Sequence, residues 1–131
     1  MELKKVYESF LDGRHQVDYR GELVGTVTSV EKVEKKESIL KIKVESLEEI
    51  VRLPKRVHPE ILVGSKIRYI KSVTECDDHR VVGYETHAGE ASPVMEYFKS
   101  ESTKHFLEII EGKFEGIEYR AEEHQKKQHE R

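Results

Sequence analysis

The sequence predicts a mainly β protein, a small five-stranded antiparallel barrel with an N-terminal helix and a C-terminal helical extension. The first observation behind this prediction is that Val and Ile together number 23 against 8 Leu, and 18 of those 23 lie within residues 17–82. Branched side chains fit a pleated strand better than a helix. The second is that polar turns divide this region into short apolar runs without a long helical pattern. We expect a helix over residues 1–13, the barrel over 14–89, a helical extension over 90–119 and a charged tail over 120–131.

The N-terminal helix is predicted from the spacing of apolar residues. Five of them would share one stripe of a helix over residues 1–12, namely Leu3, Val6, Tyr7, Phe10 and Leu11. Gly13 would end this helix. Because a helix of this length is marginal in isolation, it would either dock on the barrel or bind a partner.

Five strands are predicted between residues 17 and 86. The first covers residues 17–33 and contains Gly25, which in a strand interior often marks a bend at a barrel corner. The second, residues 39–45, alternates apolar and charged residues with the period of a half-buried strand. Pro54 ends the third strand (residues 48–53), because proline has no amide to donate. The fourth covers residues 66–73, and the fifth, residues 79–86, follows an acidic loop over residues 75–78.

The C-terminal extension is predicted from a helix start signal. Ser92 would cap the helix and Pro93 would occupy its first turn. Apolar residues that could share one helix face follow, with an end near Gly112: Met95, Phe98, Phe106, Ile109 and Ile110. Residues 120–131 are almost entirely charged or amide residues, so they would form a solvated helix end or a frayed tail.

Strand alternation predicts a basic outer face. The apolar residues of the second strand alternate with lysines, so Lys41 and Lys43 must face outward when its apolar side chains face the core. The same argument turns Lys66 and Arg68 outward on the fourth strand. An ordinary solvated face that pairs its charges across strands is the alternative interpretation, because residues 14–89 hold 14 basic and 13 acidic residues.

Residues 21–73 resemble the oligonucleotide/oligosaccharide-binding (OB) fold. The resemblance rests on the long bent first strand around Gly25 and on the fourth strand, which is led by Gly64 and continues Ser-Lys-Ile-Arg-Tyr-Ile. An SH3-like barrel is the closest rival fold. The OB resemblance implies that the face of strands two and three, with its adjoining loops, is the ligand surface.

The resemblance and the basic face together predict a non-catalytic module that binds single-stranded nucleic acid weakly. Such a site needs cations that follow the phosphates and flat side chains that stack on bases. The candidate residues are Lys41, Lys43, Arg52, Lys55, Arg56, Lys66, Arg68, Tyr19 and Tyr84. The alternative is a protein-interaction or assembly module, in which the predicted terminal helices would form a homo-oligomer or dock a partner.

No cofactor, metal or catalytic motif stands out. Cys76, Asp77, Asp78 and His79 lack the paired spacing of a zinc site, so no metal site is predicted. The single cysteine favours a reducing compartment, and the absence of a long apolar run favours a cytoplasmic, non-membrane protein. The lack of Asn and the abundance of Lys and Glu are typical of thermophile proteins.

Overall fold

The computed structural model of the chain describes residues 1–33, 39–54 and 59–130. Those residues form seven strands and one 3-10 turn (η1, Pro59–Ile61), and none of them is in an α-helix. The strands are β1 (Lys4–Leu11), β2 (Arg14–Lys32), β3 (Ile39–Val44), β4 (Leu47–Arg52), β5 (Lys66–His87), β6 (Glu90–Glu111) and β7 (Glu118–Glu130). The prediction of a mainly β protein is confirmed.

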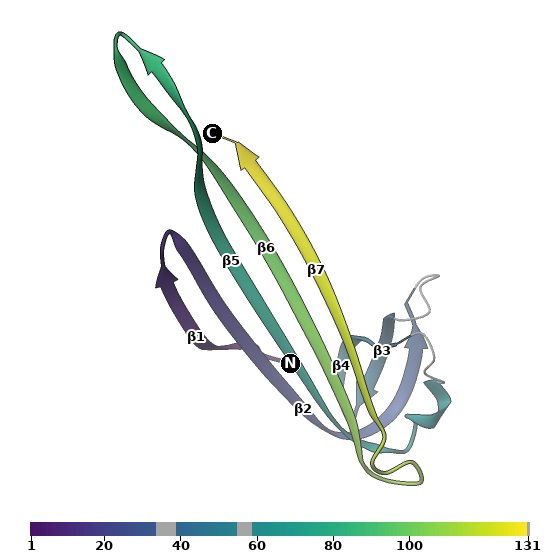
Figure 1. Ribbon diagram of the computed structural model, residues 1–131. Coiled ribbons are helices and arrows are strands. Elements are labelled where there is room, and N and C mark those ends of the chain that lie inside the picture. The colour runs from purple at the N-terminus through teal and green to yellow at the C-terminus, as the bar shows by residue number, and fades with distance from the viewer. Residues whose placement is uncertain (34–38, 55–58, 131) are drawn as a thin grey trace.

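All seven strands belong to one antiparallel sheet that curls into a half-barrel (Figure 1). Their order is β4-β3-β2-β5-β6-β7, and β1 pairs with the first part of β2. Strands β1, β2, β5, β6 and β7 make a long curved sheet, and β3, β4 and η1 lie against one end of it (Figure 1). The half-barrel therefore has one packed end and one extended end.

β2 takes part in both regions, and Gly25 marks the crossing point. Residues 14–26 of β2 pair with β5, whereas residues 27–32 pair with β3. A Cβ atom on Gly25 would lie 2.6 Å from Cγ1 of Val44 on β3. The glycine thus lets β3 approach the strand closely where it bends, as the sequence predicted from its position.

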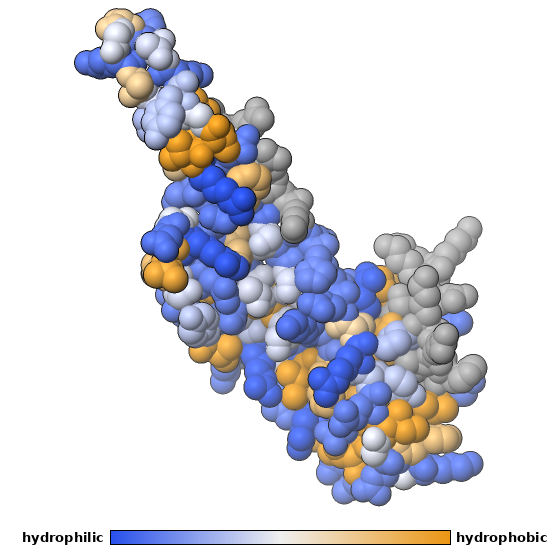
Figure 2. Space-filling model, viewed as in Figure 1, coloured by the Kyte–Doolittle hydropathy of each residue, from blue (hydrophilic) through white to orange (hydrophobic). Residues whose placement is uncertain are grey.

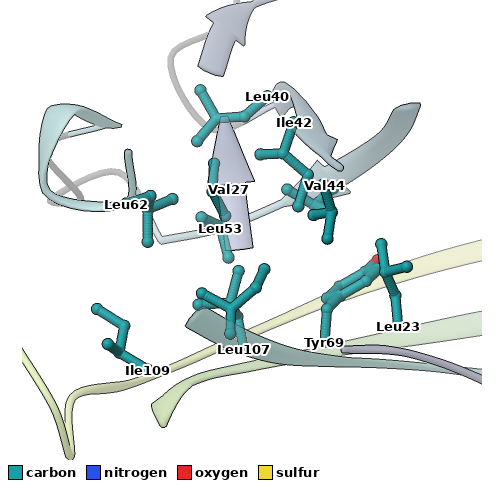
Figure 3. Packing of buried hydrophobic residues seen from close by; sticks show 12 residues of the cluster. Leu23, Val27, Leu40, Ile42, Val44, Leu53, Leu62, Tyr69, Leu107 and Ile109 are labelled. Carbon is teal, nitrogen blue, oxygen red and sulfur yellow. The ribbon is translucent and has the colours of Figure 1, made fainter. Parts of the chain in front are cut away.

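The core lies between the β3–β4 region and the long sheet (Figure 3). From the long sheet it receives five residues, Leu23, Ile67, Tyr69, Leu107 and Ile109. From the opposite side it receives Val27, Leu40, Ile42, Val44, Val51, Leu53 and Leu62. Because burial of apolar area is the main favourable term in folding, this end of the sheet holds most of the stability of the fold.

The predicted N-terminal helix is wrong, because these residues form β1. β1 and β2 are joined by a two-residue turn in which Asp12 has a φ of 49° and Gly13 a φ of 78°. Two consecutive positive φ values twist a hairpin in the direction that strands prefer, and Asp-Gly is a favoured pair for this turn. Gly13 therefore turns the chain back into a neighbouring strand.

The predicted C-terminal helix is also wrong, because these residues form β6, and the charged tail forms most of β7. Thr103, His105, Leu107 and Ile109 are buried at every second position, the period of a strand. The tail is held by pairing with β6, from Glu118 opposite Glu108 to Glu130 opposite Glu96. Helical spacing and strand spacing both fit parts of this sequence, and pairing with β5 selects the strand.

The sequence predicted a closed five-stranded barrel, whereas the strands form one longer, open sheet. The predicted fourth and fifth strands and the acidic loop between them are one continuous strand, β5, because residues 75–78 pair with β2 on one side and with β6 on the other. Among the described residues, no helix has the length and apolar character needed to cross a bilayer.

Candidate functional site

The predicted basic residues of β3 lie on its outer side, as alternation requires. Leu40, Ile42 and Val44 are buried, while Lys43 is exposed and Lys41 is half-buried. The Nζ atom of Lys41 lies 3.3 Å from an oxygen of Glu48 on β4. Lys43 forms no ion pair with any residue in the described part of the chain.

The basic residues of β5 also face away from the core, but on the other side of the molecule. Ile67 and Tyr69 point into the core, and their neighbours Lys66 and Arg68 point out through the opposite face of the long sheet. Arg68 lies between Glu22 (3.2 Å) and Glu108 (3.8 Å), and Lys66 lies 3.9 Å from Glu111. The outward residues of β3 and β5 thus belong to two separate surfaces, and most of them face carboxylates.

The remaining predicted site residues are scattered. Arg52 on β4 forms an ion pair with Glu123 on β7. Tyr19 is half-buried on β2, whereas Tyr84 is 70% exposed near the far end of β5. Lys55 and Arg56 lie outside the described residues.

Four polar side chains from four strands lie in a row beside the core and contact one another in turn. We call this row the relay; its members are Tyr69 (β5), His105 (β6), Glu123 (β7) and Arg52 (β4). The Tyr69 hydroxyl lies 2.6 Å from Nδ1 of His105, and Nε2 of His105 lies 3.1 Å from Oε2 of Glu123. Tyr69 is completely buried and His105 is 4% exposed. The relay joins strands that are far apart in the sequence.

The ionisation of the relay follows from its burial. Burial lowers the pKa of His105, and this effect outweighs the hydrogen bond to Glu123 that raises it. Burial works to raise the pKa of Glu123, but the hydrogen bond from His105 and the charge of Arg52 together lower it. Burial, and then the charges of Glu49 and Glu123, raise the pKa of Tyr69. At neutral pH the His105 ring is therefore neutral beside an ionised Glu123 and a protonated Tyr69.

This ionisation assigns the hydrogen atoms. An ionised Glu123 can only accept, so Nε2 of His105 donates to it, and Nδ1 then accepts from the Tyr69 hydroxyl. A reacting group must reach its substrate, and Tyr69 is fully buried, so the geometry favours a structural role for the relay. The prediction from sequence missed the relay because Glu123 falls in the presumed tail, although the two-residue period around His105 was visible.

Cys76 and its acidic neighbours do not converge. They lie on an extended strand, where successive side chains point to opposite faces, so Cys76 and Asp78 face one side and Asp77 faces the other. Cys76 is buried, with its Sγ 3.2 Å from Nη2 of Arg14.

The extended end of the sheet carries a projecting hairpin, which we call the arm (residues 79–95). β2 stops pairing with β5 at Asp78, and β7 stops pairing with β6 at Glu96. Beyond those points β5 and β6 pair only with each other, around the two-residue turn Ala88-Gly89. In Figure 1 the arm extends past the ends of all the other strands.

The arm exposes large apolar side chains. Val81, Val82 and Tyr84 are 49%, 52% and 70% exposed. Figure 2 shows hydrophobic surface on the arm, near the top of the view. β1, an edge of the sheet, also exposes Val6, Tyr7, Phe10 and Leu11. Exposed apolar surface on an unpaired strand or hairpin is typical of an interaction surface.

No protein-family model matches this sequence, and no curated protein or solved structure is significantly similar to it.

Proposed function

We propose that this protein is an assembly module that associates with further copies of itself, and that the arm makes the main contact. The observation that carries this proposal is the arm itself. An isolated two-stranded hairpin is at best marginally stable in water, and this one extends beyond the core with Val81, Val82 and Tyr84 exposed. Contact with another molecule would bury those side chains and support the hairpin.

The open edges of the sheet support the same proposal. β1, β4 and β7 each have one side without a strand partner in the described part of the chain. Natural proteins usually protect such edges with charges or bulges. β1 has a bulge between Lys5 and Tyr7, yet it exposes Phe10 (74%) and Leu11 (71%) beyond the bulge. The proposal replaces terminal helices with strands as the contact elements.

The proposal is tested by the oligomeric state of the protein. Light scattering during size-exclusion chromatography, over a range of concentrations, should give a mass above 15.3 kDa for the wild type. A variant in which a two-residue turn replaces residues 82–93 should run as a smaller species with the same core stability. Tyr84→Ser should weaken association, whereas Leu47→Ser, at a residue that is 52% exposed on the β3–β4 hairpin, should not.

A strictly monomeric wild type at all concentrations contradicts the proposal. So does an arm-shortened variant that associates as strongly as the wild type.

Weak binding of single-stranded nucleic acid by an OB-type module is the second candidate function. It is supported by Lys41 and Lys43, which both lie on the outer side of β3, and by the bend of β2 at Gly25, which matches the OB resemblance. A labelled oligonucleotide at low salt should bind the wild type, and reversal of Lys41, Lys43 and Arg68 to Glu should abolish that binding. Absence of binding by the wild type removes this candidate. A cytoplasmic location and a thermophile source stay predictions from composition.

A further inference from the structure

One surface of the long sheet carries cations that the described part of the chain does not neutralise. Lys4 on β1 lies opposite Arg20 on β2, which lies opposite Ser72 on β5, which lies opposite Lys104 on β6. Residues that are directly opposite share a face, so these side chains form one row across four strands. Lys4, Arg20 and Lys104 are all exposed, and no ion pair joins them to any described residue.

The row is electrostatically unfavourable in the isolated chain. Like charges directly opposite each other on neighbouring strands destabilise a sheet, as Lys4 and Arg20 do here. Glu122 lies opposite Lys104, but its carboxylate is 3.3 Å from Nε2 of His124 on its own strand. An anionic partner would remove this repulsion.

A hollow lined by both polar and apolar residues overlaps the row at Ser72 and Lys104. It has a volume of about 520 Å³, and its lining includes the apolar Ile70 and Phe106, the basic Lys104 and Arg120, and the acidic Glu122. Ile70 and Phe106 are half-buried, since the β3–β4 region covers only the other face of the sheet. Arg120 forms an ion pair with Glu118, 3.6 Å away, so it is not one of the unneutralised cations. We call the three cations of the row and the two apolar residues of the hollow together the cationic strip, made of Lys4, Arg20, Lys104, Ile70 and Phe106. It combines positive charge with apolar surface.

The tip of the arm has the complementary composition. From residue 81 to residue 95 its only charged residues are Glu85 and Glu90, with no lysine or arginine. Tyr84 is adjacent to Glu85 and is the most exposed aromatic residue of the arm. The tip is thus acidic and apolar, whereas the strip is basic and apolar.

We infer that the cationic strip receives the tip of the arm from a second copy of this chain. This inference rests on the proposed function and names the receiving surface. The arm cannot reach the strip of its own molecule, because Val81 lies nine residues along β5 from Ser72, about 30 Å at the rise of a strand. Tip and strip are different surfaces, so each copy donates one contact and receives another. Repeated head to tail, this contact gives a ring or a filament.

The strip suits the arm better than it suits a nucleic acid. The guanidinium carbon of Arg120 lies 4.9 Å from the centroid of the Phe106 ring and occupies one face of it, so that face is not open to a stacked base. The apolar side chains of the arm also require an apolar partner surface, and phosphates do not provide one.

Charge reversal and its repair test the inference. We would measure association by light scattering for the wild type, for R20E/K104E, for E85K/E90K, and for an equimolar mixture of the two double variants. Each double variant alone should associate about tenfold or more weakly, because like charges then meet at the contact. In the mixture, the basic tip of E85K/E90K can bind the acidic strip of R20E/K104E, and the acidic tip of R20E/K104E can bind the basic strip of E85K/E90K. Because both contacts between the two variants join opposite charges, mixed species should form. The quadruple variant should regain the affinity of the wild type.

Two matched controls separate this effect from a general change of charge. K43E reverses an exposed lysine outside the strip, and E45K reverses an exposed glutamate outside the arm. Both should associate like the wild type. Circular dichroism should give the same spectrum for all variants, since every substituted side chain is exposed.

The outcomes distinguish the two proposals. If shortening the arm gives monomers while both double variants associate normally, the strip is not the receiving surface and the assembly function stands. If shortening the arm changes nothing, the assembly function fails as well. If R20E/K104E loses binding of a labelled single-stranded oligonucleotide and keeps its association, the strip is a nucleic-acid surface and the inference is overturned.

Discussion

The substitution Tyr69→Phe tests whether the relay stabilises the fold through hydrogen bonding. It removes one hydroxyl and keeps a completely buried ring in place. Nδ1 of His105 then loses the donor that lies 2.6 Å away, and the ring is only 4% exposed, so water cannot easily replace it. A buried acceptor without a partner costs about 1–3 kcal/mol. We expect the free energy of unfolding to fall by that amount.

The assay is urea unfolding at pH 7.5 and one fixed protein concentration, because association would otherwise add to the measured stability. The midpoint should decrease while the dependence on urea stays constant, since the area buried on folding hardly changes. Tyr119→Phe is the matched control, because the Tyr119 hydroxyl makes no hydrogen bond within the described residues. We expect it to change stability by less than about 0.5 kcal/mol. Equal effects of the two substitutions would refute the reasoning.

Three other predictions concern pH, the core and the bend of β2. The pKa of His105 is lower in the folded state than in the unfolded state, so the unfolded chain binds more protons at acidic pH. The free energy of unfolding should therefore be highest above about pH 6.5 and should fall as the pH decreases below that value. The loss should be smaller in His105→Gln. Urea midpoints at pH 7.5 and 5.5 check this, and an unchanged loss in the variant contradicts it. Ile67→Ala should cost about 2–5 kcal/mol in the same assay, against less than about 1 kcal/mol for the exposed Ile50→Ala. Gly25→Ala should lower the free energy of unfolding by about 1–3 kcal/mol, because its Cβ would meet Val44. Gly83→Ala should be nearly neutral, because nothing lies within 4 Å of a Cβ atom there. Similar effects of the two substitutions would count against the close approach of β3 to Gly25.

Local alternation was readable from the sequence wherever one face of a strand is buried. Leu40, Ile42 and Val44 are buried and Lys43 is exposed, as their spacing predicted. Ile67 and Tyr69 face inward on β5 for the same reason. The position of Gly25 also predicted the bend of β2. These features depend on each strand's own residues, so no knowledge of a partner strand was needed.

The terminal segments were not predicted correctly, because their apolar residues fit more than one period. Phe98, Phe106 and Ile109 can share a helix face, but His105, Leu107 and Ile109 alternate as in a strand. The turn Asp12-Gly13 was a hairpin signal in the sequence, and it was interpreted as the end of a helix. The acidic segment over residues 75–78 looked like a loop because acidic residues are rare in strands.

By itself, the sequence determined that the chain is rich in β structure, that the apolar side chains of β3 face inward, and that Ile67 and Tyr69 of β5 do so as well. Only the tertiary structure decided that β5 and β6 extend past their neighbours as an arm, that the basic side chains lie on separate surfaces, and that His105 meets Glu123. The physical reason is that a side chain's face follows from its position along its own strand, whereas strand length and pairing depend on segments far away in the sequence. Pairing with β2 on one side and β6 on the other keeps β5 a single strand. The residues of β5 alone do not predict which strands it pairs with.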